Sequence, residues 1–287
     1  MLQYHETPIK EINDVEFERA GIRLLVKRED LNHKLVSGNK WWKLKYNLID
    51  AAEKNLKTLL TYGGAYSNHI FATAAAAAEV GFKSVGIIRG EEVLPLNPTL
   101  AFARKMGMQI HYVSRDAYRS KSTKSVVEKS DSFYLIPEGG SNLLAVKGVR
   151  ELAAKLNTPF EYLCCAVGTG GTLSGLIEGL SPEKKILGFP TLKGAEFLTE
   201  EIKKLSERSK HLSNWELVHD YHFGGYAKST PQLMQFIERF KTTHDIPLEF
   251  VYTGKMMAGI YHLISSGYFS RGSTILAIHT GGLQFGS

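Results

Sequence analysis

Lys40 is the residue of this chain whose position most strongly indicates covalent chemistry. An expected helix begins near Lys40, runs to about Lys54 and follows directly on the turn Ser37-Gly38-Asn39. The amine would lie beside backbone N–H groups and the positive end of the helix dipole, which disfavour the charged ammonium. A neutral amine can attack a carbonyl carbon and form a Schiff base. The alternative is a solvated surface lysine, the commonest state of lysine in proteins.

A glycine-rich loop later in the chain has the composition of an anion-binding turn. It follows an expected buried strand and reads Gly168-Thr169-Gly170-Gly171-Thr172. Glycines let the backbone approach a ligand closely, and the helix expected after the loop offers free N–H groups. The loop lacks the Gly-Lys-Ser/Thr of nucleoside triphosphate sites, and Leu at position 173 breaks the G-x-G-x-x-G spacing of dinucleotide sites. A tight turn without a ligand is the alternative.

Two loops at other expected strand ends carry amide and hydroxyl side chains. Ser67, Asn68 and His69 lie at the entry of a helix, where a carboxylate would accept several hydrogen bonds; ordinary helix capping is the alternative. In the second loop, Tyr252 is a candidate acid or hydrogen-bond donor, and Thr253 is a candidate neutral partner for a ring nitrogen. The alternative for this pair is a β-favouring dipeptide before a helix-starting turn.

Short apolar strands that alternate with helices would position these loops. We expect strands at 23–26, 58–61, 84–88, 109–113, 133–136, 162–167, 186–189, 216–218, 249–252 and 274–278. The pattern predicts an α/β fold of open, mostly parallel sheets with helices on both faces. Ligands of such sheets bind where strand carboxyl ends meet helix starts, and the loops lie there. The polar stretch 120–130 is expected to be a surface helix or loop.

Length and composition restrict the class of protein further. The 287 residues suffice for two compact lobes, and the net charge of +6 forms no stripe with interleaved aromatics, so no nucleic-acid partner is expected. No apolar run reaches transmembrane length and the N-terminus lacks a signal-peptide layout. The adjacent Cys164 and Cys165 are expected to be reduced and buried in a strand. We therefore expect a cytoplasmic protein with no membrane partner.

Six motifs in one order resemble a known enzyme family. They are Gly38-Asn39-Lys40-x-x-Lys43-Leu44, Gly63-Gly64-x-x-Ser67-Asn68, Gly139-Gly140-Ser141-Asn142, Gly168-Thr169-Gly170-Gly171-Thr172, Tyr252-Thr253-Gly254-Lys255 and His279-Thr280-Gly281-Gly282. From about residue 7 to 282 the chain resembles the 1-aminocyclopropane-1-carboxylate deaminase / D-cysteine desulfhydrase family. The resemblance implies a tryptophan-synthase-β-like fold (fold type II) and pyridoxal 5′-phosphate as the cofactor.

The resemblance also implies which residues hold this cofactor. Lys40 matches the lysine that forms the Schiff base with the cofactor. The loop Gly168–Thr172 matches the phosphate loop, and Lys43 is a possible second phosphate contact. Asn68 matches the residue beside the cofactor ring, and Thr253 matches the partner of the pyridine nitrogen.

Substrate contacts are implied in the same way. Ser67, Asn68 and His69 match the residues that hold the substrate carboxylate, and Ser67 is also a candidate catalytic hydroxyl. Tyr252 matches a tyrosine that faces the substrate. Tyr226 resembles the second active-site tyrosine, although its local motif is loose.

Two positions distinguish the branches of this family. Deaminases that open the cyclopropane ring typically carry Glu and Leu where this chain has Thr253 and Thr280, and we assign Thr280 to the substrate site. A carboxylate keeps a pyridine nitrogen protonated, whereas threonine suits a neutral ring and the loss of a good leaving group such as sulfide. Trp41-Trp42 and His69 depart from the usual family residues.

We therefore expect a lyase that acts on a small amino-acid substrate and converts D-cysteine to pyruvate, ammonia and hydrogen sulfide. Ring opening of 1-aminocyclopropane-1-carboxylate is the alternative, followed by other β-eliminations or racemisations. A cofactor-binding protein without catalysis and an NAD-binding dehydrogenase are further alternatives. The expected small lobe spans 45–140 and is inserted into a larger lobe of 1–44 and 141–287. The cofactor would lie in the cleft, and the resemblance implies a homodimer.

Overall fold

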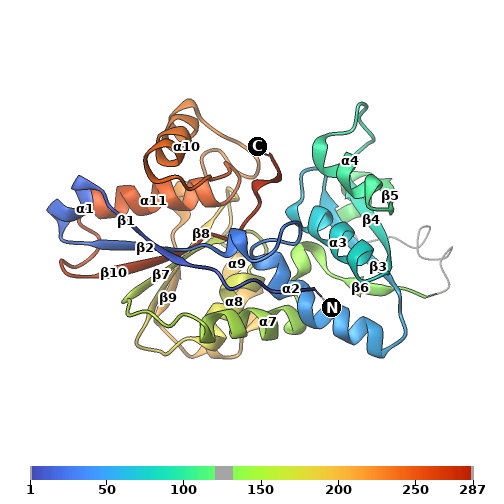
Figure 1. Ribbon diagram of the computed structural model, residues 1–287, viewed down its shortest axis with the longest axis horizontal. Helices are drawn as coiled ribbons and strands as arrows, with labels where there is room; N and C mark the ends of the chain where they lie inside the picture. The colour runs from blue at the N-terminus through green and yellow to red at the C-terminus, as the bar shows by residue number, and fades with distance from the viewer. Residues whose placement is uncertain (1, 120–131, 286–287) are drawn as a thin grey trace.

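The computed structural model describes residues 2–119 and 132–285 and contains two sheets covered by helices (Figure 1). One sheet with its helices forms the larger lobe, at the left of Figure 1, and the other forms the smaller lobe at the right. This arrangement confirms the predicted α/β class with mostly parallel sheets. Among the described residues, no helix is both long enough and apolar enough to span a membrane.

The larger sheet has six strands in the order β1-β2-β10-β7-β8-β9. Neighbouring strands are parallel, except that β1 and β2 are antiparallel. The strands are β1 (Ile9–Ile12), β2 (Arg23–Lys27), β7 (Tyr162–Val167), β8 (Lys185–Pro190), β9 (Trp215–Leu217) and β10 (Thr274–Ile278). Every residue of β7 is buried, and its Cys164 and Cys165 are free and buried, as predicted.

The smaller sheet has four parallel strands in the order β5-β4-β3-β6. They are β3 (Thr58–Gly64), β4 (Lys83–Arg89), β5 (Met108–Val113) and β6 (Tyr134–Ile136). All four strands fall within the small lobe that we proposed at 45–140, and the limits of that lobe stay a prediction.

Helices cover both sheets, and several of them begin at polar caps. Ser67, Asn97 and Asn142 each accept a backbone N–H bond in the first turn of the helix that follows them. The α-helices are α1 (Val15–Ala20), α2 (Asn39–Glu53), α3 (Asn68–Glu79), α4 (Pro98–Lys105), α5 (Arg115–Arg119), α7 (Leu143–Ala154), α8 (Gly171–Gly179), α9 (Leu198–Leu205), α10 (Pro231–His244) and α11 (Thr253–Ser265). Short 3₁₀ helices are η1 (Glu29–Leu31), η2 (Glu138–Gly140), η3 (Arg208–Lys210), η4 (His219–Tyr221) and η5 (Leu283–Phe285).

Helix α2 belongs to the cores of both lobes. Trp41 and Trp42 pack in one cluster with Leu163 of the larger sheet. Leu44, two residues further on, packs in a second cluster with Leu59 of the smaller sheet. The predicted boundary between 44 and 45 therefore passes through the interior of a continuous helix.

Three elements differ from the expectation. The predicted strand at 249–252 is wrong, because the Glu249 carboxylate accepts N–H bonds from residues 251, 252 and 253 at 2.6–2.8 Å and closes a turn before α11. The short elements β1 and α1 were not predicted. The stretch 120–130, expected to be a surface helix or loop, lies outside the described residues.

Candidate active site

The predicted site residues converge on one cavity between the two sheets. Every one of them except Tyr226 and Thr253 lines this inner cavity. The lining residues are Asn39, Lys40, Lys43, Ser67, Asn68, His69, Gly139, Ala166, Val167, Gly168, Thr169, Gly170, Gly171, Thr172, Leu173, Tyr252 and Thr280. They come from α2, the start of α3, η2, the end of β7, the start of α8, the turn before α11 and the segment after β10.

Lys40 is the second residue of α2 and presents its side chain to the inner cavity. Burial lowers the pKa of its amine to about 8, and the nearby Cys165 opposes this shift. At pH 8 about half of this amine is neutral, against well below one per cent of an ordinary lysine. The amine is thus suited to attack a carbonyl, and burial is the main cause of the lowered pKa.

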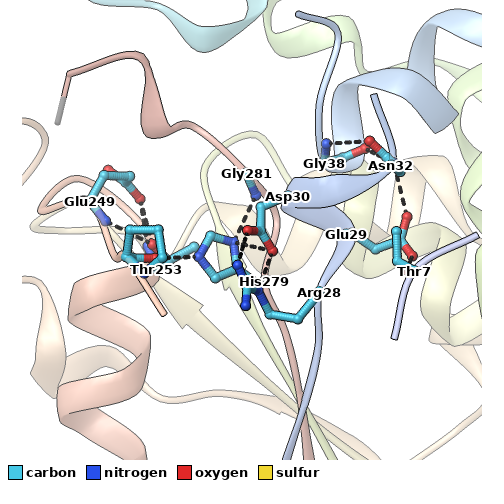
Figure 2. Close-up of polar contacts among 11 residues, drawn as sticks. Thr7, Arg28, Glu29, Asp30, Asn32, Gly38, Glu249, Thr253, His279 and Gly281 are labelled. Atoms are coloured by element: carbon cyan, nitrogen blue, oxygen red, sulfur yellow. Dashed lines mark hydrogen bonds and ion pairs between the residues drawn. The ribbon is translucent and has the colours of Figure 1, made fainter. Parts of the chain in front are cut away.

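A buried polar network around Glu29 fixes the turn that precedes Lys40 (Figure 2). The Asn32 amide donates to the Gly38 carbonyl at 3.0 Å, and its oxygen accepts the Gly38 N–H at 2.9 Å. The same amide donates to the fully buried Glu29 carboxylate, which also accepts bonds from Thr7 Oγ1 and Trp42 Nε1, both at 2.7 Å. Trp42 therefore satisfies a buried charge, which explains one residue of the unusual Trp pair.

Gly38 brings this turn against the end of β10. Its φ is 70°, and a Cβ at this position would lie 1.9 Å from the Thr280 carbonyl oxygen. The N–H of Asn39 donates to that same oxygen at 3.2 Å. Only glycine allows this approach, which places Lys40 and Thr280 in one cavity.

The glycine-rich loop has the form of an anion site. Its Gly170 is the N-cap of α8 at φ 84° and provides no side-chain cap, so the first N–H groups of α8 have no side-chain acceptor. A Cβ on Gly171 would lie 2.6 Å from Ser141 Oγ, which is itself 2.6 Å from Thr169 Oγ1. Hydroxyl groups and helix N–H groups thus surround one position, as a phosphate requires.

Lys43 adds a second buried amine beside this loop. Its Nζ donates to the Gly139 carbonyl at 2.6 Å and to Ser141 Oγ at 3.0 Å. Burial lowers the pKa of Lys43 well below its usual value, and the charge of Lys40 lowers it further. No carboxylate of the described residues pairs with either amine within 4 Å. The phosphate and the carbonyl of pyridoxal phosphate therefore fit the groups that are present.

The loop at the start of α3 is held more firmly than the sequence indicated. Ser67 Oγ accepts the N–H of His69 at 3.2 Å, so it caps α3 while it lines the cavity. His69 Nε2 lies 2.8 Å from Thr61 Oγ1, whose hydroxyl donates to the Ile136 carbonyl, so His69 is the donor of that bond. Burial lowers the pKa of His69 well below its usual value, and the ring is neutral. It can orient this loop but supplies no positive charge to a carboxylate.

Tyr252 and Tyr226 lie side by side at the edge of the inner cavity. Their ring centroids are 6.1 Å apart at an interplanar angle of 71°. A Cβ on Gly168 would lie 3.1 Å from Tyr252 Cε1, so the Tyr252 ring lies against the phosphate loop. Burial raises the pKa of both phenols. Both hydroxyls stay protonated near neutral pH and can donate a proton.

Thr253 and Thr280 occupy different environments. The Thr253 hydroxyl donates to Glu249 Oε1 at 3.1 Å (Figure 2). Thr253 does not line the inner cavity. Thr280 lines the cavity, and the adjacent His279 anchors it by donating Nε2–H to the Pro247 carbonyl at 2.7 Å. Thr280 is therefore better placed than Thr253 to meet a ring nitrogen, and the role given to Thr253 stays a prediction.

Sequence reasoning overlooked three residues that complete the site. Asn39 Nδ2 donates to Thr172 Oγ1 at 2.8 Å. The signal for Asn39 is its position within the motif Gly38-Asn39-Lys40. The Glu249 carboxylate accepts the N–H of Thr253, the first residue of α11. An acidic residue four positions before a helix start is a signal that the sequence contains. Gln284 Nε2 donates to Asn68 Oδ1, and no local signal marks that contact.

Comparisons with known proteins agree with this geometry. The family of pyridoxal-phosphate dependent enzymes matches residues 1–281. A Pyrococcus abyssi protein named "Putative 1-aminocyclopropane-1-carboxylate deaminase" is 33% identical, over 97% of this chain and 89% of that protein. A mitochondrial bifunctional D-cysteine desulfhydrase/1-aminocyclopropane-1-carboxylate deaminase of Arabidopsis thaliana is 29% identical, over 92% of this chain and 73% of that protein.

Solved structures with a similar fold include a relative of the same kind. One described as a homologue of 1-aminocyclopropane-1-carboxylate deaminase superposes with a TM-score of 0.86 at 30% identity, over 99% of this chain and 91% of that chain. The predicted fold type II and cofactor are thereby confirmed. The chain belongs to the pyridoxal-phosphate dependent enzyme family, and within it to the relatives of 1-aminocyclopropane-1-carboxylate deaminase.

Proposed function

We propose that this enzyme eliminates the β-substituent of D-cysteine, with pyruvate, ammonia and hydrogen sulfide as products. One observation carries the proposal: among the described residues, no Asp or Glu lines the inner cavity, whereas Thr280 does. A neutral partner leaves a pyridine nitrogen without a full charge, which suits a good leaving group.

The side chains of the cavity have complementary roles in this reaction. Bound pyridoxal phosphate supplies an electron sink for the charge that develops at the substrate α-carbon. Lys40, neutral in about half of the molecules near pH 8, takes the α-proton. Ser67 and Asn68 orient the substrate carboxylate. Tyr252, kept protonated by burial, donates a proton to the departing sulfur.

Ring opening of 1-aminocyclopropane-1-carboxylate to 2-oxobutanoate and ammonia is the second candidate. The names of the relatives favour it, since the Pyrococcus abyssi protein is named for that activity and the Arabidopsis thaliana protein for both. The two reactions differ in the bond that breaks, a C–S bond in one and a C–C bond in the other. The two reactions therefore favour different protonation states of the pyridine nitrogen.

A direct comparison of the two substrates tests the proposal. Purified enzyme loaded with cofactor is given D-cysteine, L-cysteine or 1-aminocyclopropane-1-carboxylate, and keto acid and sulfide are scored separately. We expect kcat/KM for D-cysteine to exceed that for the cyclopropane compound by about a hundredfold or more, about 2.7 kcal/mol. Equal or faster release of 2-oxobutanoate would refute the assignment to D-cysteine.

A further inference from the structure

A second, wider chamber of about 510 Å³ opens directly from the inner cavity. The two share five lining residues, which are Ser67, Gly139, Gly168, Thr169 and Tyr252. Tyr226 lines only the outer chamber, so the tyrosine pair stands at the junction. Because Tyr252 is the proposed proton donor to the leaving group, a β-substituent longer than a thiol would extend into the outer chamber.

The two walls of the outer chamber differ in chemistry. The wall near α9 carries four apolar side chains, Leu192, Phe197, Leu198 and Leu205, beside the charged residues Glu201 and Lys204. Phe197 is 54% exposed, an unusual state for phenylalanine, and its ring offers a surface to an aliphatic chain. The chamber can therefore contact the methylene groups of a long substituent.

The opposite wall carries Arg89, at the end of β4, and Glu138, in η2. Neither forms an ion pair within 4 Å with any other described residue. The guanidinium of Arg89 lies over the ring of Tyr118, 5.6 Å from its centroid. Both charges also reach Tyr226: burial raises the pKa of that phenol, Arg89 opposes the rise and Glu138 adds to it.

A second pair of charges in the chamber is already neutralised. Lys204 Nζ donates to Glu201 Oε1 at 2.6 Å, one turn apart on α9. This pair needs no ligand, whereas Arg89 and Glu138 offer one cation and one anion to the same space. A carboxylate would pair with Arg89 and an ammonium with Glu138, which together are the groups of an amino-acid head.

We propose that the outer chamber binds the distal amino-acid head of a thioether or disulfide that joins two amino acids, with Arg89 and Glu138 as its contacts. The proposal rests on the β-elimination proposed above and names a wider substrate class for it. For lanthionine the proton leaves the α-carbon, the C–S bond breaks and the sulfur takes a proton. With one water the products are pyruvate, ammonia and cysteine.

A matched series of substrates tests this subsite in the loaded enzyme. The series is S-propyl-D-cysteine, S-(2-carboxyethyl)-D-cysteine, S-(2-aminoethyl)-D-cysteine and D,D-lanthionine, whose tails carry no charge, an anion, a cation or both. We expect kcat/KM for lanthionine to exceed that for the S-propyl compound by about tenfold or more, the effect of a hydrogen bond to a charged group.

Single substitutions then test whether Arg89 binds the distal carboxylate and Glu138 the distal ammonium. Arg89→Met is expected to lower the ratio of lanthionine to S-propyl turnover by about tenfold and to abolish the preference for the carboxyethyl tail. Glu138→Gln is expected to remove only the preference for the aminoethyl tail. Lys204→Met serves as the matched control, because that lysine lines the same chamber and is already paired; its ratio should stay within about twofold.

The possible failures are distinguishable. If D-cysteine is turned over but the tails make no difference, or every thioether is inert, the subsite is refuted and the proposed function stands. If D-cysteine itself is not turned over, the proposed function fails. Binding is then read from the shift of the cofactor absorption band on addition of lanthionine, and a shift that is equally strong in wild type and Arg89→Met refutes the subsite.

Discussion

At the scale of single residues, the site depends on two buried amines that have no acidic partner among the residues that the structure describes. Burial lowers the pKa of both amines, and the charge of Lys40 lowers the pKa of Lys43 further. A dianionic phosphate in the loop before α8 would offset the charge of Lys43 and leave Lys40 free to react. The roles of the two lysines are thereby separated, although they lie one turn apart on α2.

Replacing Lys40 tests its role as the covalent attachment point. Lys40→Ala is expected to abolish the visible absorption band of bound cofactor and to reduce turnover by at least about a thousandfold. Lys45→Ala is the control on the same helix, because Lys45 pairs with Glu151 at 2.5 Å at the surface, and it should retain the band. A Lys40→Ala protein with an unchanged band would contradict the assignment.

The lowered pKa of Lys40 predicts a distinct pH dependence of cofactor uptake. The neutral amine is the reactive form, and its pKa falls from the ordinary 10.5 to about 8. The rate at which cofactor-free protein takes up pyridoxal phosphate should therefore rise as pH increases toward about 8 and level off above it. Stopped-flow absorbance measures the rate, with free Nα-acetyl-lysine as the reference. A rate that keeps rising through pH 10 would show an unperturbed amine.

At the scale of elements, the turn before α2 must pass very close to the end of β10. Gly38 and Gly81 provide a matched pair, since their φ values are 70° and 74°. A Cβ on Gly38 would overlap the Thr280 carbonyl, whereas a Cβ on Gly81 would meet nothing within 4 Å. Strain from positive φ is thus common to both positions, and only Gly38 adds a steric conflict.

Alanine at the two positions should therefore have different effects. Gly81→Ala is expected to cost about 1 kcal/mol in the free energy of unfolding, the penalty of the left-handed conformation. Gly38→Ala is expected to cost at least about 3 kcal/mol and to weaken cofactor binding. Urea titration and the cofactor band measure the two effects. Equal losses from both variants would mean that Gly38 contributes only its backbone freedom.

The same elements show what the sequence could predict. Strands such as β7 and β10 were predicted to the residue, because uniformly apolar runs bounded by turns have few other interpretations. The run Phe250-Val251-Tyr252 is also apolar, yet the Glu249 carboxylate accepts bonds from three successive N–H groups and holds the run as a turn. A side-chain cap of this kind depends on geometry that apolar periodicity does not record.

For the site residues too, local sequence patterns were predictable and contacts that depend on the folded geometry were not. Lys40 and the glycine-rich loop were found because turns before helices have recognisable compositions, and both line the inner cavity. Long-range contacts were missed, since Gln284 reaches Asn68 from 216 positions away. A linear motif likewise does not show which of the two threonines, Thr253 or Thr280, faces the cavity. The answer depends on how the turn after Glu249 is folded.

At the scale of the whole molecule, the C-terminal segment makes a polar contact with the smaller lobe. The bond from Gln284 to Asn68 connects the last described helix with the start of α3. It also holds the Asn68 side chain at the edge of the inner cavity. Substrate binding should therefore depend on the C-terminal segment, although that segment lies far from Lys40 in the sequence.

Gln284→Ala tests this dependence. We expect KM for D-cysteine to rise several-fold, by roughly 1 kcal/mol of lost hydrogen bonding, while the cofactor band is retained. Gln232→Ala is the control, because Gln232 is exposed on α10, away from the cavity lining. A Gln284→Ala enzyme with unchanged KM would show that Asn68 keeps its position without this bond.

Trp42 and Leu44 lie in two different hydrophobic cores, two residues apart on one helix. We therefore expect any rocking of one lobe against the other to turn about an axis near the first turns of α2. In a rotation of this kind, atoms near the axis move little and atoms further from it move more. Lys40 lies in the first turn of α2, close to this axis, whereas Arg89 lies at the end of β4. We expect such a motion to change the position of Arg89 relative to the tail of a substrate and to leave the reacting amine in place.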